Sequence, residues 1–172
     1  NISQGLGLEL VGYGKVEAQK VENESDGNYK KNQNIDGGLD INYNITSGLK
    51  ASLTLNTDFA ETEVDDRQIN LTRFPIRFPE KRDFFLEGAN IYRFAPSSGV
   101  YPYFSRKIGL QSGNPIPILY GGRVIGKIGK VELAAQQVKT RQTDFNNSED
   151  FSVIRIKQNF LKESSIGVLY TR

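Results

Sequence analysis

Two stretches of strict apolar–polar alternation, joined by a tight turn, constrain the fold of this chain more than any other feature. From Leu39 to Ile45 every odd position is apolar and every even position is polar, and the alternation resumes from Leu49 to Leu55. A period of two residues is the pattern of a β-strand with one apolar and one polar face. The connection Thr46-Ser47-Gly48 predicts a hairpin that pairs Ile45 with Leu49, with both apolar faces on one side.

The same pattern predicts two more hairpins, over 118–135 with a turn at Gly129-Lys130 and over 154–170 with a turn near 161–165. A first strand over 5–22 changes phase at Val11, which predicts a β-bulge there. About seven strands are therefore expected, and no helix-period stretch of useful length appears. On the second hairpin, one face is predicted to carry Ile118, Tyr120, Gly122, Val124, Gly126 and Ile128.

The lengths of the connections alternate. Short ones fall at 46–48, 129–130 and about 161–165, and long polar ones at 23–34, 60–116 and 143–150. If the strands run up and down, all the short turns lie at one end, as in bacterial outer-membrane barrels. Strands of roughly ten residues also suit a tilted membrane-spanning strand. The pattern predicts that residues 1–172 are the amino-terminal portion of one antiparallel outer-membrane β-barrel, since a closed barrel needs about eight strands. A soluble antiparallel meander is the alternative.

This register assigns side chains to two faces. Those expected to point out of the barrel are Leu39, Ile41, Tyr43, Leu53, Leu55, Val124, Val131, Leu133, Ile154, Ile156, Ile166 and Val168. Those expected to point inward are Asp40, Asn42, Asn44, Lys50, Thr54, Arg123, Lys127 and Glu132.

The composition excludes several kinds of chemistry. The chain has no Cys and no His, so classical zinc, haem and iron–sulfur ligation and Ser-His-Asp catalysis are impossible within it. With a net charge of only +2, the chain lacks the strongly basic character that is typical of proteins that bind nucleic acid. No cofactor is expected, and no nucleic-acid partner.

Residues 60–116, which we call the insert, break the alternation. Half of the 18 aromatic residues lie between Phe74 and Phe104. Pro79 followed by EKRDFFLE and Gly88 predicts a helix of about two turns. Residues 74–94 are expected to be ordered and partly buried, with Phe78, Phe84 and Phe85 against the inner wall. The candidate ligand or plug contacts are Arg73, Arg77, Phe78, Glu80, Lys81, Arg82, Phe84, Phe85, Tyr101 and Tyr103.

Three groups in or beside the insert have alternative interpretations. The acidic cluster at 58–66 could bind Ca²⁺, but ion pairs with neighbouring arginines are favoured because the spacing is not that of an EF-hand loop. Glu80, Asp83 and Glu87 would share one helix face like paired glycosidase carboxylates. Their basic neighbours, expected to include Arg73, Arg77, Lys81 and Arg82, would keep all three ionised, so an ion-pair network is favoured over an enzyme. The third group consists of five aromatic residues, Tyr92, Phe94, Tyr101, Tyr103 and Phe104. Their rings could form a sugar-stacking platform, but anchoring of the insert against the barrel wall is the favoured role.

The runs NTDFAETEVDDRQINLTRFPIRFPEKRDFFLEG (56–88), YFSRKIGL (103–110) and PIPILYGGRVIGKIGK (115–130) resemble a family of Gram-negative outer-membrane proteins. That family has an uncharacterised β-barrel domain, which usually follows a domain like the family 9 carbohydrate-binding modules. The resemblance implies location in the outer membrane and no established reaction. The expected function is a non-enzymatic barrel involved in surface glycan binding or uptake. Its expected partners are the lipid bilayer, a glycan, and other envelope proteins or further strands of its own chain. The alternative is a soluble β-rich glycan-binding or interaction domain.

Overall fold

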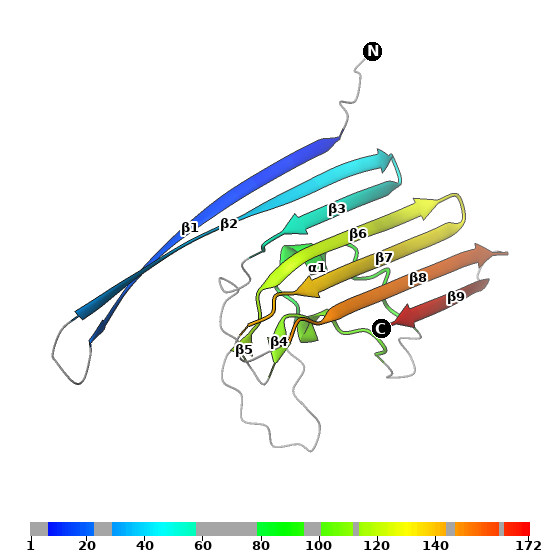
Figure 1. Cartoon of the computed structure of the whole chain (residues 1–172). Coiled ribbons are helices and arrows are strands. Elements are labelled where there is room, and N and C mark those ends of the chain that lie inside the picture. Colours follow the sequence, from blue (N-terminus) through cyan, green and yellow to red (C-terminus); the bar gives the residue numbers. More distant parts are fainter. Residues whose placement is uncertain are drawn as a thin grey trace, which may run out of the picture.

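The computed structural model of the chain describes residues 7–22, 29–57, 79–94, 101–111, 114–143, 147–161 and 164–172. Within them, seven antiparallel strands form one sheet in chain order (Figure 1), which confirms the all-β prediction. The strands are β1 (Leu8–Glu22), β2 (Tyr29–Thr46), β3 (Leu49–Leu55), β6 (Ile118–Ile128), β7 (Val131–Thr140), β8 (Asp150–Phe160) and β9 (Ser164–Thr171). The other described elements are a short helix α1 (Asp83–Leu86), a 3-10 turn η2 (Ser105–Lys107), and the small ladder of β4 (Leu110–Gln111) with β5 (Asn114–Pro115).

The first predicted hairpin forms with a corrected turn. Beyond the turn, the register of β2 against β3 is the expected one. At the turn itself, Thr46 rather than Ile45 faces Leu49, because the ladder shifts between Asn44 and Thr46. The connection is therefore only Ser47-Gly48. Ile45 is left without a partner in the ladder. The rest of β2 and β3 therefore keeps the predicted apolar and polar faces.

The second hairpin has the expected turn, with Ile128 facing Val131. Its far end differs from the prediction, because the ladder shifts between Ile118 and Tyr120. Ile118 therefore faces Thr140 and is fully buried, on the opposite face from the one predicted. In the third hairpin, Phe160 faces Ser164, so β9 begins inside the predicted turn.

The first strand contains no bulge. The β1–β2 ladder is uninterrupted from Leu8–Tyr43 to Glu22–Tyr29, and Val11 faces Asp40 within it. The backbone pairing continues although the side-chain alternation changes, because ladder hydrogen bonds do not depend on side-chain polarity. The same ladder takes residues 29–34 into β2, so the long connection predicted at 23–34 is shorter than expected.

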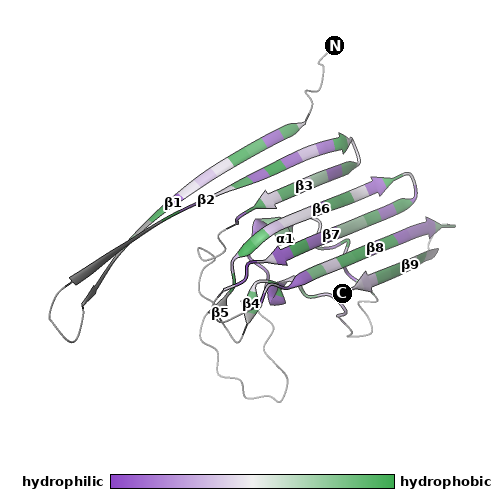
Figure 2. Ribbon diagram, in the orientation of Figure 1, coloured by the Kyte–Doolittle hydropathy of each residue, from purple (hydrophilic) through white to green (hydrophobic). Residues whose placement is uncertain are grey.

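The sheet has one apolar and one polar face, and the two predicted sets of side chains separate onto them without exception. Leu53, for example, faces Ile41 on one side and Gly122 on the other, while Thr54 faces Asp40 and Gly121. Strand colours alternate accordingly between green and purple in Figure 2.

The apolar face is open and the polar face is covered. On the apolar face, Ile166 and Val168 are 64% and 66% exposed. On the polar face, Thr54, Arg123 and Arg155 are buried. The same face also buries the apolar residues Ile125, Ala134, Val138 and Val153 under the insert. Apart from this patch, the arrangement is the reverse of a half-buried sheet in water, whose apolar face packs on the core. This inverted burial agrees with the expectation that the insert lies against the inward face of the sheet.

The sheet is open at both edges. β1 and β9 lie at opposite ends of the strand order, and the described strands contain no pairing between them. The expected barrel is therefore not closed by this part of the chain. The chain order also places the short hairpin turns at one end of the sheet and the long connections at the other, as predicted.

Among the described residues, no helix is long and apolar enough to cross a membrane.

Candidate functional site

The candidate site is the part of the insert that covers the polar face, residues 79–94 and 101–111. Of the candidate contacts from the sequence, Glu80, Lys81, Arg82, Phe84, Phe85, Tyr101 and Tyr103 belong to it. Arg73, Arg77, Phe78 and the acidic cluster at 58–66 lie outside the described residues.

Phe84 and Phe85 anchor α1 to the sheet, as predicted. Phe85 is 3% exposed and packs in a cluster with Ile108, Ile118 and Val138. The ring of Phe84 meets that of Phe85 edge-on, with centroids 5.1 Å apart. Burial of such rings contributes on the order of 2 kcal/mol each, which helps to offset the entropy of ordering the insert.

The helix is shorter than predicted. Instead of two turns from Pro79, α1 spans four residues, because Arg82 is extended and its N–H is bonded to the side chain of Glu80. The chain is extended again at Glu87, and Gly88 follows with φ +71°. Glu80 and Glu87 therefore lie outside the helix, and the expectation that Glu80, Asp83 and Glu87 share one helical face is wrong.

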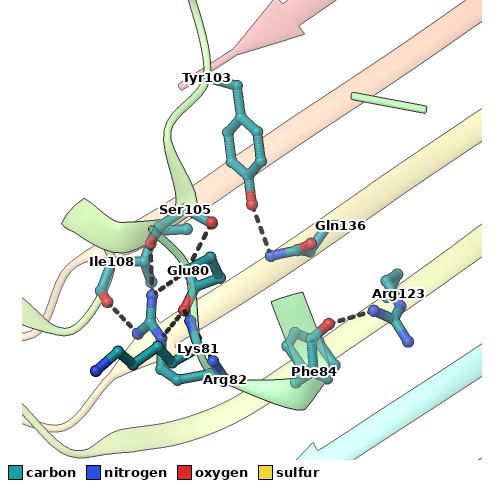
Figure 3. Close-up of polar contacts among 9 residues, drawn as sticks. All are labelled: Glu80, Lys81, Arg82, Phe84, Tyr103, Ser105, Ile108, Arg123 and Gln136. Carbon is teal, nitrogen blue, oxygen red and sulfur yellow. Dashed lines mark hydrogen bonds and ion pairs between the residues drawn. The ribbon is translucent and has the colours of Figure 1, made fainter. Parts of the chain in front are cut away.

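Glu80 and Arg82 form a buried ion pair that joins the two segments of the insert (Figure 3). Glu80 Oε1 accepts from Arg82 Nε at 2.7 Å and from the backbone N–H groups of Lys81 and Arg82. Its Oε2 accepts from Arg82 Nη2 at 2.8 Å and from the Ser105 hydroxyl at 2.6 Å. Arg82 also donates to the carbonyl oxygens of Ser105 and Ile108, at 2.7 and 2.6 Å. The predicted pairing of Arg82 with an acid is confirmed.

The pKa of Glu80 follows from these contacts. Burial raises it, but the hydrogen bonds and positive charge of Arg82, with the Ser105 hydroxyl, lower it by more, so the net pKa lies below its ordinary value. The carboxyl group is therefore ionised at neutral pH.

A second ion pair fixes the carboxyl end of α1 to the sheet. Arg123 of β6 donates Nη1 to the carbonyl oxygens of Phe84 and Glu87, and Nη2 to Glu87 Oε2 at 2.5 Å. Lys50 of β3 donates to Glu87 Oε1 at 2.6 Å. The guanidinium of Arg123 lies 4.9 Å from the ring centroid of Phe84. The sequence placed Lys50 and Arg123 on the inward face but did not identify Glu87 as their partner. Their inward position was the one sign in the sequence that they could pair with an acid of the insert.

The pKa of Glu87 is also below its ordinary value. Partial burial raises it, and the hydrogen bond from Lys50 and the charges of Arg123 and Lys50 outweigh that effect.

The aromatic residues mainly anchor the insert, the role favoured from the sequence. Tyr92 is 5% exposed and packs with Ile125, Ala134 and Val153 of the sheet. Tyr103 lies 5.1 Å from Tyr92, ring to ring, and its hydroxyl accepts from Gln136 Nε2 at 3.2 Å (Figure 3). Burial raises the pKa of both tyrosines, so both stay neutral hydroxyls.

Tyr101 differs from the other described aromatic residues of the insert because it is 57% exposed. It borders a cavity of about 300 Å³ between the two segments of the insert. The cavity is lined by Glu80, Phe85, Ala89, Tyr92, Arg93, Phe94, Tyr101, Pro102, Tyr103, Phe104 and Ser105.

A larger, shallow hollow of about 690 Å³ lies on the apolar face. It forms where the small residues Ala51, Gly122 and Ala135 are flanked by Tyr43 and Ile154. Its lining also includes the polar residues Gln137, Ser152 and Arg172.

The described residues contain no group of three acidic side chains placed to hold a metal ion. The acidic cluster at 58–66 lies outside the described residues, so the expectation that it forms ion pairs and does not bind Ca²⁺ stays a prediction. What the described residues define is an antiparallel seven-stranded sheet whose polar face is covered by an ion-paired, aromatic-rich segment.

The chain belongs to the family described as Domain of unknown function (DUF5916), whose match covers residues 6–133. No curated protein and no solved structure matches the chain significantly. The family match agrees with the expected uncharacterised domain family, while the neighbouring carbohydrate-binding-like domain remains a prediction.

Proposed function

We propose that this chain forms part of an outer-membrane β-barrel of a Gram-negative bacterium, a non-enzymatic protein that binds or takes up surface glycans. The observation that carries the barrel proposal is the inverted burial of the sheet. Outer-membrane barrels present an apolar band to lipid and keep a polar interior that is often occupied by loops or a plug. An open apolar face and a polar face occupied by the insert fit a barrel of the plugged kind.

The apolar face is too continuous to be incidental. Ile154, Ile156, Ile166 and Val168 are each more than a third exposed on the neighbouring strands β8 and β9, and Leu53 on β3 is exposed to a similar degree on the same face. Contiguous exposed apolar patches of more than a few hundred Å² mark membrane or protein interaction sites. The alternative, a soluble interaction domain, would need a protein partner over this whole face.

The open edges define what else the barrel needs. Unpaired backbone groups in lipid cost several kcal/mol each. The free edges of β1 and β9 therefore require further strands of the same chain or of another envelope protein. The sheet supplies seven strands, and closure takes about eight or more.

The carboxylates support a non-enzymatic role. A glycosidase general acid needs a raised pKa, whereas the pKa values of Glu80 and Glu87 are both lowered. Their oxygens are also occupied by Arg82, Arg123 and Lys50.

Lipid contact is tested with single tryptophans, since the chain has neither Trp nor Cys. Ile156→Trp places the probe on the apolar face, and Lys157→Trp, the neighbouring residue on the polar face, is a control at the same depth. In vesicles containing brominated lipid, we expect strong quenching at position 156 and weak quenching at 157. Circular dichroism and a heat-dependent shift on detergent gels check that both variants fold. Equal quenching at the two positions, or none at either in a chain that is folded without detergent, would refute the proposal in favour of the soluble alternative.

A further inference from the structure

The cavity between the two segments of the insert has the lining of a small-molecule site. Its volume of about 300 Å³ is at the lower end of the range for ligand pockets. Six aromatic rings form most of the wall, and a few polar groups interrupt them, the combination typical of such pockets. The rings are those of Phe85, Tyr92, Phe94, Tyr101, Tyr103 and Phe104.

The polar groups of the lining suit a neutral ligand with hydroxyl groups. Glu80 is neutralised by Arg82, so this part of the wall carries no net charge. The Ser105 hydroxyl donates to Glu80 and keeps its oxygen available to accept a hydrogen bond.

The charges around the cavity argue against a cationic ligand, which is the other class that aromatic cages take. Arg93 lines the cavity and is exposed. The guanidinium of Arg155 lies 5.1 Å from the ring centroid of Phe94, so one aromatic face already holds a cation. With Glu80 paired, no carboxylate of the lining is left to balance a bound ammonium group.

We propose that this cavity binds a single neutral sugar ring, with Tyr101 as the exposed stacking face and the Ser105 hydroxyl as a hydrogen-bonding group. This inference rests on the glycan role proposed above and assigns it to one site. A pyranose ring has apolar faces that pack on aromatic rings and equatorial hydroxyls that reach polar groups at their edges. The cavity volume limits the site to one ring, so a longer glycan would enter by its terminal residue.

The test is a titration of the detergent-folded chain with methyl glycosides of common hexoses, in which saturation-transfer NMR measures binding. We expect millimolar binding of at least one glycoside and a loss of about tenfold in affinity for Tyr101→Ala, from the lost ring contact. Tyr170→Ala is the matched control, because Tyr170 is similarly exposed, at 53%, but lies on the apolar face. Its affinity should equal that of the unchanged chain.

Three results would overturn the inference: no binding of any glycoside, equal losses for the two tyrosine variants, or tighter binding of tetramethylammonium than of the sugars. Each differs from a failure of the barrel proposal, which is decided by lipid quenching at positions 156 and 157. Circular dichroism of both tyrosine variants separates lost binding from lost folding.

Discussion

Adding one methyl group to the polar face, at Gly121, tests whether the insert is packed there. A Cβ atom at Gly121 would lie 2.9 Å from Thr54 Cγ2 and 3.1 Å from Phe84 Cζ. Neither neighbour can move freely. Thr54 is 2% exposed and its hydroxyl donates to Asp40, while Phe84 is held through its carbonyl oxygen by Arg123. Gly121→Ala should therefore push the insert away from the sheet.

The neighbouring glycine provides the control. A Cβ atom at Gly122 would meet only Leu53 Cδ1, at 4.0 Å, on the apolar face. Gly→Ala without strain stabilises a protein by about 0.4–1 kcal/mol, and overpacking a filled site costs about 1–3 kcal/mol. Gly122→Ala should thus be neutral or stabilising, and Gly121→Ala should be less stable than it by about 1–3 kcal/mol.

The free energy of unfolding can be measured by urea titration in detergent micelles, followed by far-UV circular dichroism. Surface substitutions usually change the free energy of unfolding by less than about 0.5 kcal/mol. If the free energies of unfolding of the two alanine variants differ by less than this, the space beside Gly121 is empty. That result would refute the docking of α1 on the polar face.

Three further predictions concern the insert. Replacing Phe84 and Phe85 together by Ala in the barrel closed by its further strands should raise single-channel conductance in planar bilayers, because the cover of the polar face loses its anchors. Leu86→Ala, at an exposed position, should leave the conductance unchanged. Unchanged conductance in the double variant would contradict an occluded lumen. The lowered pKa of Glu80 means that its contribution to stability is present above the ordinary Glu pKa of about 4.3 and is lost as pH falls through the folded value. Urea titrations between pH 6 and 3 should therefore show a shallower loss of stability for Glu80→Gln than for the unchanged chain; parallel curves would rule out this role. Glu87→Gln should cost less than Glu80→Gln in the same titrations at pH 7. The side chain of Glu87 is 41% exposed, and its buried partner Arg123 keeps its bonds to the carbonyl oxygens of Phe84 and Glu87 and to the Ser52 hydroxyl. An equal or larger cost would contradict the ranking.

The strands, their faces and the ends at which the connections lie could be predicted from the sequence. Side chains alternate strictly between the faces of a strand, so residues such as Leu53 and Thr54 identify their faces without knowledge of their neighbours. A two-residue turn such as Gly129-Lys130 then fixes the register of its hairpin. These are local constraints, and local pattern is sufficient for them.

The irregularities were decided by tertiary contacts. Ile118 changed faces because the ladder shifts beside Tyr120, where the buried cluster around Phe85 takes its side chain. The three consecutive apolar residues Ile118-Leu119-Tyr120 interrupt the alternation, but they do not state which of them turns inward. Val11 shows the converse, since the continuous ladder kept its register despite the change of side-chain pattern.

The sequence by itself determined that this chain forms strands with one apolar and one polar face, and that the insert carries aromatic residues and charges that favour burial. The sequence also predicted that the insert lies against the inner, polar face, but only the tertiary structure decided which contacts hold it there. Those contacts join residues far apart in the chain, Arg123 with Glu87 and Gly121 with Phe84, and their energies arise only once the strands have assembled. A period of two residues specifies two faces, but it does not state which side chain of the insert meets which strand.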